Sequence, residues 1–139
     1  MLANPDRFPL GMKDMADHVH NAGLKFGLTL GSGIKTCQGY FGSLKSELID
    51  AGSLWSWGVD YLRYGNCFAE GIPAKDRYTS MSWALNQTKP ALFHPINVDM
   101  YYAINNLGDQ NVKEWGPGIA NSWTTTAQIN RGAVNQNAW

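Results

Sequence analysis

The hydrophobic positions of this 139-residue chain alternate between helical and strand periodicity. Residues 11–22 carry apolar side chains at the spacing of one helix face, and Gly23 stands where such a helix ends. Apolar residues then alternate with small or polar ones over Leu24–Leu30, which predicts a strand, and a Gly-Ser-Gly break follows. The helical stripe consists of Met12, Met15, Ala16 and Val19.

The same order recurs three more times along the chain. The patterns predict helices over Leu44–Trp55, Tyr78–Leu85 and Val112–Trp115, and strands over Val59–Tyr64, Ala91–Ile96 and Ile119–Trp123. Strands that alternate with helices at this spacing are typical of βαβ units and a parallel sheet. We find no linker, so we expect one α/β domain over residues 1–139.

Charge and composition exclude several classes of partner. The chain has 11 basic and 11 acidic residues and no run of either, so it lacks the positive surface that nucleic acids and anionic membranes attract. No segment approaches the roughly 20 apolar residues of a membrane span. Residues 1–10 show no signal-peptide pattern, so we expect either that a secretory signal lies upstream or that there is none. His18 and His20 point to different sides of a helix, which argues against a metal site.

Two cysteines, Cys37 and Cys67, allow either one disulfide or two buried thiols. The count alone does not decide between them. The glycosylation sequon Asn86-Gln87-Thr88 favours an oxidising, secretory origin.

Several motifs give the chain a specific resemblance that covers nearly its whole length. They are Lys35-Thr36-Cys37-Gln38-Gly39-Tyr40, Trp57-Gly58-Val59-Asp60-Tyr61-Leu62, Tyr64-Gly65-Asn66-Cys67 and Asn121-Ser122-Trp123, with the opening segment 4–12 and Asp76-Arg77-Tyr78. In this order and spacing they resemble family 27 glycoside hydrolases, the retaining α-galactosidases. The resemblance implies a partial (β/α)8 barrel comprising strands three to six, a Cys37–Cys67 disulfide, a secretory location, and no cofactor or metal.

The catalytic carboxylates of that family are missing here. The family nucleophile is the Asp of Tyr-Asp-Asn-Cys, where this chain has Gly65, and the acid/base is the Asp of Thr-Thr-Gly-Asp-Ile, where it has Gln128. Glycine has no side chain to attack with, and an amide cannot deliver a proton at neutral pH. Asp60 and Asp99 are the nearest alternatives; we expect Asp60 to pair within the barrel wall and Asp99 to be a solvated loop residue.

The resemblance also predicts an altered substrate pocket. Gly31 replaces a pocket Asp, Arg63 a Lys and Thr124 an Arg, and His94-Pro95-Ile96-Asn97-Val98 is assigned to the family segment Ser-Leu-Cys-Glu/Asn-Trp. The predicted pocket residues are Gly31, Arg63, Tyr64, Asn97 and Trp123. Core packing is expected for the helical residues Trp55, Trp57, Trp83 and Trp115, so Trp123 alone is predicted to form a ligand wall.

Three hypotheses follow. The first is an inactive α-galactosidase-family fragment, a pseudoenzyme with weak affinity for galactose or α-galactosides. The second is a non-catalytic structural or interaction module, and the third is part of a live enzyme that a second chain completes. Four strands from the middle of a barrel leave two sheet edges and an uncovered inner face. We therefore expect an exposed apolar inner face, and a homo-oligomer or a complex with the missing barrel half.

Overall fold

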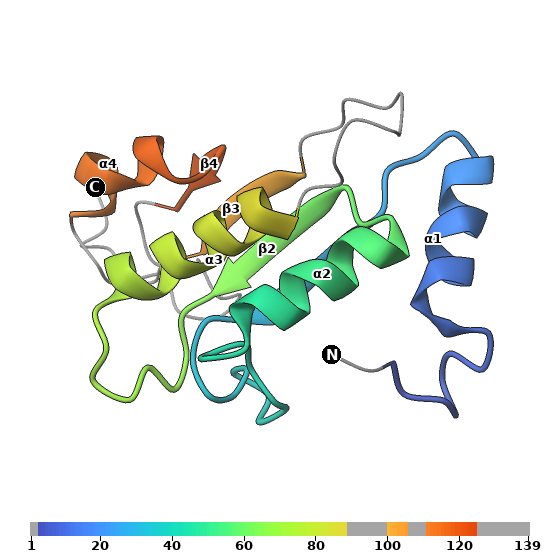
Figure 1. Cartoon of the computed structure of the whole chain (residues 1–139), viewed down its shortest axis with the longest axis horizontal. Helices are drawn as coiled ribbons and strands as arrows, with labels where there is room; N and C mark the ends of the chain where they lie inside the picture. The colour runs from blue at the N-terminus through green and yellow to red at the C-terminus, as the bar shows by residue number, and fades with distance from the viewer. Residues whose placement is uncertain (1–2, 89–99, 106–110, 125–139) are drawn as a thin grey trace, which may run out of the picture.

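The computed structural model describes residues 3–88, 100–105 and 111–124, and their arrangement is a sheet with helices packed along it (Figure 1). The elements in chain order are α1 (Gly11–Asn21), β1 (Gly27–Gly31), α2 (Glu47–Trp57), β2 (Tyr61–Gly65), α3 (Ala74–Thr88), β3 (Tyr101–Asn105), α4 (Val112–Trp115), the 3-10 helix η1 (Gly116–Gly118) and β4 (Ser122–Trp123). Among the described residues, no helix combines the length and the apolar character that a membrane span needs.

The four strands form one parallel sheet in the order β1-β2-β3-β4. Neighbours in the sheet are also neighbours in the sequence, and α2 and α3 form the first two crossovers. The prediction of an α/β fold with parallel strands and intervening helices is therefore confirmed. β1 and β4 are the edges of the sheet over the part of the chain that the structure describes, as expected.

Local sequence explains where the first two helices end. α2 stops at Gly58, which adopts the left-handed conformation (φ 74°) and donates its N–H to the carbonyl of Trp55. Gly23, just after α1, has φ 75° and donates to the carbonyl of His20. Glycine adopts this conformation without the steric cost of a Cβ, so both glycines stop a helix and release the chain toward the next strand.

The core lies between the sheet and the α2–α3 pair, which pack against each other across one face (Figure 1). Alternation along the strands directs every second side chain into it. On β2, Leu62 and Tyr64 are fully buried, and on β3 Tyr102 and Ile104 are nearly so. The helices contribute Ala51, Leu54, Tyr78, Met81, Ala84 and Leu85.

The opposite face, which would point into a closed barrel, carries small and polar residues on β1 and β2. They are Gly27, Thr29, Gly31, Tyr61, Arg63 and Gly65. Of the large hydrophobic residues that are exposed in the described part of the chain, only Tyr61 stands on this face, at 37% exposure. On β1 and β2 the structure therefore does not show the expected exposed apolar inner face, because small and polar residues occupy most of these positions.

The third strand is not where the apolar pattern put it. The predicted segment 91–96 lies outside the described residues, whereas the strand that pairs with β2 is Tyr101–Asn105. This strand belongs to a continuous apolar run, residues 100–104, in which Met100, Tyr102, Ala103 and Ile104 are all buried. A run that contains Pro95 was a poor candidate for a strand with neighbours on both sides, because proline cannot donate to the ladder.

Asp60, which directly precedes β2, ties the end of α1 to the sheet. Its carboxylate accepts hydrogen bonds from the N–H of Phe26 (2.8 Å) and from Lys25 Nζ (3.1 Å), and it pairs with His20 Nε2 at 2.7 Å. Burial of the carboxyl opposes its ionisation, but these contacts outweigh that effect and lower the pKa of Asp60. The expectation that Asp60 pairs within the barrel wall is confirmed.

Replacing Asp60 by Asn should lower the free energy of unfolding by about 1–3 kcal/mol, because it removes a partly buried ionic acceptor. The pKa of Asp60 is lower in the folded chain than its ordinary value of 3.8. Its contribution is therefore present above that value and is lost as the pH falls through the folded pKa, and the variant should lack this part of the acid dependence. Urea titrations between pH 3 and pH 7 measure both effects.

Asp17→Asn is the matched control, since the Asp17 carboxylate pairs with Lys13 at 2.8 Å on the exposed side of α1. It should change stability by less than about 0.5 kcal/mol. Equal losses in the two variants would contradict a special role for Asp60.

Candidate active site at the carboxyl edge of the sheet

The first three strands end level with one another. Gly31, Gly65 and Asn105 are the last residues of β1, β2 and β3, and the parallel register pairs Gly31 with Gly65 and Gly65 with Asn105. Enzymes built on a (β/α)8 barrel have their active sites at the carboxyl ends of the strands. The predicted nucleophile position and the predicted pocket position Gly31 therefore lie side by side at that edge.

The two glycines have different surroundings. Among the described residues, a Cβ on Gly65 would meet only the carbonyl oxygen of Leu30, at 3.5 Å, which is an ordinary contact. A Cβ on Gly31 would lie 3.1 Å from both the Lys35 carbonyl oxygen and the Thr36 Cα, so the loop would have to move by a few tenths of an ångström. Space for a side chain therefore remains at Gly65, whereas the chain's own loop fills it at Gly31.

A disulfide joins the loops that follow β1 and β2. Cys37 and Cys67 are bonded, with a Cα–Cα distance of 5.3 Å, as the family resemblance implied. The backbone reinforces this link, because the N–H of Ser32 donates to Gly65 O (2.8 Å) and that of Ile34 donates to Phe68 O (3.1 Å). The two loops thus form one rigid rim beside the strand ends.

Arg77 of α3 forms hydrogen bonds with both loops of this rim. Its guanidinium donates to the Ser32 hydroxyl, the Asn66 side-chain oxygen and the Ile72 carbonyl. Ser32 directly follows Gly31 and Asn66 directly follows Gly65, so one buried cation, 3% exposed, fixes both strand ends. In the sequence Arg77 is recognisable only as part of the Asp76-Arg77-Tyr78 motif, because nothing in its spacing indicates these contacts.

The predicted pocket residues divide between the two faces of the sheet. Arg63 is in register with Thr29 and Ala103, on the same open face as Gly65. Tyr64 and Trp123 are both in register with Ile104, which belongs to the core on the helix-covered face. The prediction that these two aromatic residues line the pocket is therefore corrected: alternation along each strand turns them toward the helices.

Tyr64 belongs to an aromatic cluster rather than to the site. Its ring packs edge-on against Tyr78 at a centroid distance of 5.6 Å and against Tyr102 at 6.0 Å. Burial raises the pKa of Tyr64 well above its usual range, and the negative charge of Glu47 adds to the shift. Tyr64 therefore stays neutral under physiological conditions and offers no acid or base for chemistry.

Several predicted residues lie outside the described part of the chain: Asn97, Gln128, Asp99 and His94. The strand-end position in register with Gly65 is Asn105, not a residue of the 94–98 segment that was assigned to it. Over the ranges that the structure describes, no group of three or more potential metal ligands comes together.

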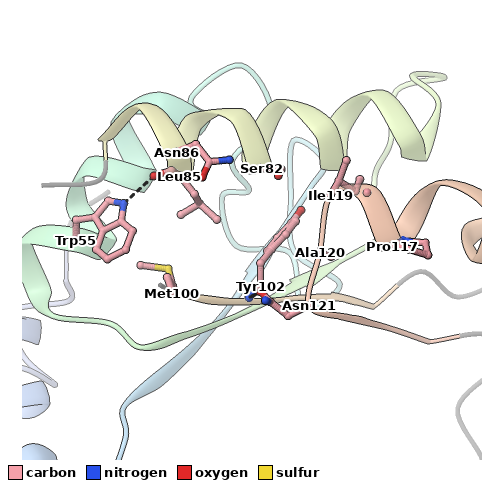
Figure 2. A pocket seen from close by; sticks show the side chains of 11 residues that line it. Trp55, Ser82, Leu85, Asn86, Met100, Tyr102, Pro117, Ile119, Ala120 and Asn121 are labelled. Atoms are coloured by element: carbon pink, nitrogen blue, oxygen red, sulfur yellow. Dashed lines mark hydrogen bonds between the residues drawn. The ribbon is translucent and has the colours of Figure 1, made fainter. Parts of the chain in front are cut away.

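A cavity of about 450 Å³ lies away from these strand ends, between α3 and the η1–β4 segment (Figure 2). Trp55 closes one end of it, and its indole N–H donates to the Leu85 carbonyl at 3.1 Å. Trp55, Trp57 and Trp115 pack against the core as expected. Trp83 does not; it is 57% exposed, so core packing was the wrong expectation for this residue.

A family model described as alpha galactosidase A (Melibiase_2) matches residues 1–134. The chain is 44% identical over 132 residues to alpha-galactosidase mel1 of Schizosaccharomyces pombe and 41% identical over 130 residues to alpha-galactosidase 3 of Arabidopsis thaliana. These alignments cover 91% and 94% of this chain but 28% of each relative. The chain therefore spans less than a third of the length of these relatives.

Solved structures of α-galactosidases are also similar to this chain. Alpha-galactosidase I from Mortierella vinacea superposes with a TM-score of 0.79 at 38% identity, over 88% of this chain and 30% of that one. The Saccharomyces cerevisiae α-galactosidase solved with raffinose gives a TM-score of 0.78 at 40% identity, over 87% and 26% of the two chains.

The two strand-end glycines should respond differently to the same added methyl group. Gly65→Ala should leave the free energy of unfolding unchanged or raise it by up to about 1 kcal/mol, because alanine restricts the unfolded chain. Gly31→Ala should cost about 1–3 kcal/mol, because backbone atoms of the loop must move. Chemical denaturation of both variants tests this, and similar values for the two would contradict the described packing of the loop on β1.

Proposed function

The chain belongs to the alpha galactosidase A family of glycoside hydrolases, and we propose that it is a catalytically inactive member with weak affinity for galactose or α-galactosides. The family scaffold persists in the parallel sheet, the strand-end register and the disulfide. What distinguishes this chain from a hydrolase lies at the strand ends, and function depends on such sites rather than on the fold.

Gly65 is the observation that carries the proposal. It ends β2 on the open face, beside Gly31, at the position that corresponds to the family nucleophile. A retaining glycosidase needs two carboxyl groups about 5–5.5 Å apart, one of which forms the covalent intermediate. Glycine removes the covalent route altogether, and Gln128 at the acid/base position removes the proton donor, which alone contributes typically about 10²- to 10⁴-fold.

Asp60 cannot replace the missing nucleophile. It lies at the amino end of β2, five positions before Gly65, which corresponds to about 16 Å along a strand. Its oxygens are already engaged by Phe26, His20 and Lys25. The pocket also differs beyond the two catalytic positions. At Gly31, the loop that carries Lys35 and Thr36 lies where a larger residue would place its side chain.

We further propose a secretory location. The Cys37–Cys67 disulfide supports it, because disulfides persist in oxidising compartments and are rare in the cytosol. The sequon at Asn86 supports the same location.

The purified chain should hydrolyse a chromogenic α-galactoside no faster than buffer, and Gly65→Asp with Gln128→Asp should recover little, because Gly31 and Thr124 still differ from the family. Isothermal titration with galactose should detect weak, millimolar binding. Turnover by the unaltered chain would refute the proposed inactivity, and absence of any binding would favour a purely structural role.

A chimera separates the effect of the absent carboxylates from the effect of barrel strands that lie outside this chain. Residues 1–134 should replace the matching segment of the Schizosaccharomyces pombe enzyme, and the chimera should be inactive although its barrel is complete. The double substitution should then give a small fraction of the parental kcat/KM, whereas Gly65→Asn with Gln128→Asn should give none. Full recovery by the two aspartates would show that the pocket is intact after all.

A second candidate role, an interaction module, is favoured by the open edge of β1. A groove of about 810 Å³ runs along this strand, between the amino-terminal segment and α2. Its apolar lining includes Phe8, Met12, Leu28, Leu30, Phe41 and Trp57. A strand edge beside an apolar groove can add another strand. We propose that a second copy of the chain occupies it; pairing with other strands of the family's barrel is the alternative.

Light scattering at micromolar concentration should therefore show a dimer or larger species. Phe41→Ser should weaken it, because Phe41 is 95% exposed and lines the groove. Ile49→Ser is the control, since Ile49 is 69% exposed on α2 but does not line that groove. A compact monomer of the unaltered chain, or equal effects of both variants, would contradict this role.

A further inference from the structure

A positive charge stands in the middle of the open face of the sheet. Arg63 is the central residue of β2, which lies between β1 and β3 (Figure 1). The register places Arg63 beside Thr29 on one strand and Ala103 on the other. Both neighbours are small, and the Arg63 side chain is half-buried.

No acidic residue shares this face in the strands that the structure describes. The residues that the register puts on it are Gly27, Thr29, Gly31, Tyr61, Arg63, Gly65, Tyr101, Ala103, Asn105 and Ser122. Arg63 is the one charged residue among them. Because a guanidinium stays charged in proteins, these positions together carry a positive charge.

The acidic residues that lie nearest to Arg63 in the sequence do not pair with it. The oxygens of Asp60, three positions earlier, are engaged by Phe26, Lys25 and His20. Glu70 lies in the loop after β2 and is exposed. No ion pair or hydrogen bond joins the Arg63 side chain to another residue that the structure describes. Its charge is therefore available to a ligand.

We propose that the open face takes a sugar that carries a carboxylate, a galacturonide in preference to a neutral galactoside. This inference rests on the proposed function, which places a saccharide at this face. The planar guanidinium of an arginine donates two parallel N–H bonds to a carboxylate, whereas the hydroxymethyl group of a galactoside forms only neutral hydrogen bonds. Arg63 thus selects for the charged sugar.

The residues around Arg63 suit the rest of such a ligand. Thr29 is exposed and Ser122 is partly exposed, and their hydroxyl groups can exchange hydrogen bonds with those of a sugar. Gly65 is two positions beyond Arg63, about 7 Å along the strand, and space for a side chain remains there. A sugar ring can therefore lie over the strand ends with its carboxylate toward Arg63.

Two ligands that differ only at C6 test this inference on the 139-residue chain: methyl α-galacturonide and methyl α-galactoside. Isothermal titration at about 20 mM salt should give a dissociation constant about tenfold lower for the galacturonide, because charge-assisted hydrogen bonds are roughly twice as strong as neutral ones. At about 0.5 M salt this ratio should fall, because salt screens the interaction of Arg63 with the carboxylate.

Variants of Arg63 separate its charge from its geometry. Arg63→Gln should bring the ratio of the two dissociation constants close to one. Arg63→Lys should retain part of it, because lysine keeps the charge but not the paired donors. Arg7→Gln is the matched control and should keep the full ratio, since Arg7 is exposed in the amino-terminal segment. A ratio measured within one variant is unaffected by a loss of folded protein.

Equal affinity for the two ligands, or a preference that survives in Arg63→Gln, would overturn the inference and leave the proposed affinity for galactosides standing. Displacement of the galacturonide by equimolar acetate would also overturn it, since any carboxylate would then suffice. Binding of the galacturonide alone would support the inference and contradict binding of neutral galactosides. If neither ligand binds, the inference and the proposed sugar affinity both fail.

Discussion

The parallel register of β1, β2 and β3 is the constraint on which the rest of the structure depends. It sets which residues end level with one another, and hence that Gly31 and Gly65 stand together. It also sets which side chains face the helices, because paired positions in a parallel sheet share a face. A slip by one residue would turn Arg63 into the core and Tyr64 out of it.

The strand ends are held independently of the chemistry that the family performs there. The disulfide, the Ser32-to-Gly65 backbone hydrogen bond and the buried Arg77 all act on loop atoms next to the glycines. None of these contacts requires a carboxylate at Gly65. The packing of the scaffold therefore does not depend on a carboxylate at this position, which makes it compatible with the inactivity proposed above.

Sequence patterns predicted the parts of the fold that local rules determine. α1 and α2 follow from apolar spacing and end near Gly23 and Gly58, where the left-handed conformation favours glycine. The third strand was misplaced because two apolar runs follow each other closely, and the prediction took 91–96 although the strand that forms is Tyr101–Asn105.

The candidate site was predictable only in part. Motifs predicted the Cys37–Cys67 disulfide that forms and put Gly31 and Gly65 at strand ends, where they lie, because each belongs to a string that resembles the family. They placed Tyr64 and Trp123 in the pocket by proximity in sequence, but neighbours along a strand point to opposite faces. The contacts of Arg77 with Ser32 and Asn66 join residues up to 45 positions apart, and no local pattern reveals such a link.

The composition of the open face bears on the association proposed above. An apolar inner face would have driven association by burial alone, but Thr29, Arg63 and several glycines occupy it. The apolar surface lies instead beside the β1 edge, in the groove that contains Phe41 and Leu28. Association at that edge would combine backbone pairing with burial of the groove. A polar inner face would then remain hydrated, as a pocket for a saccharide requires.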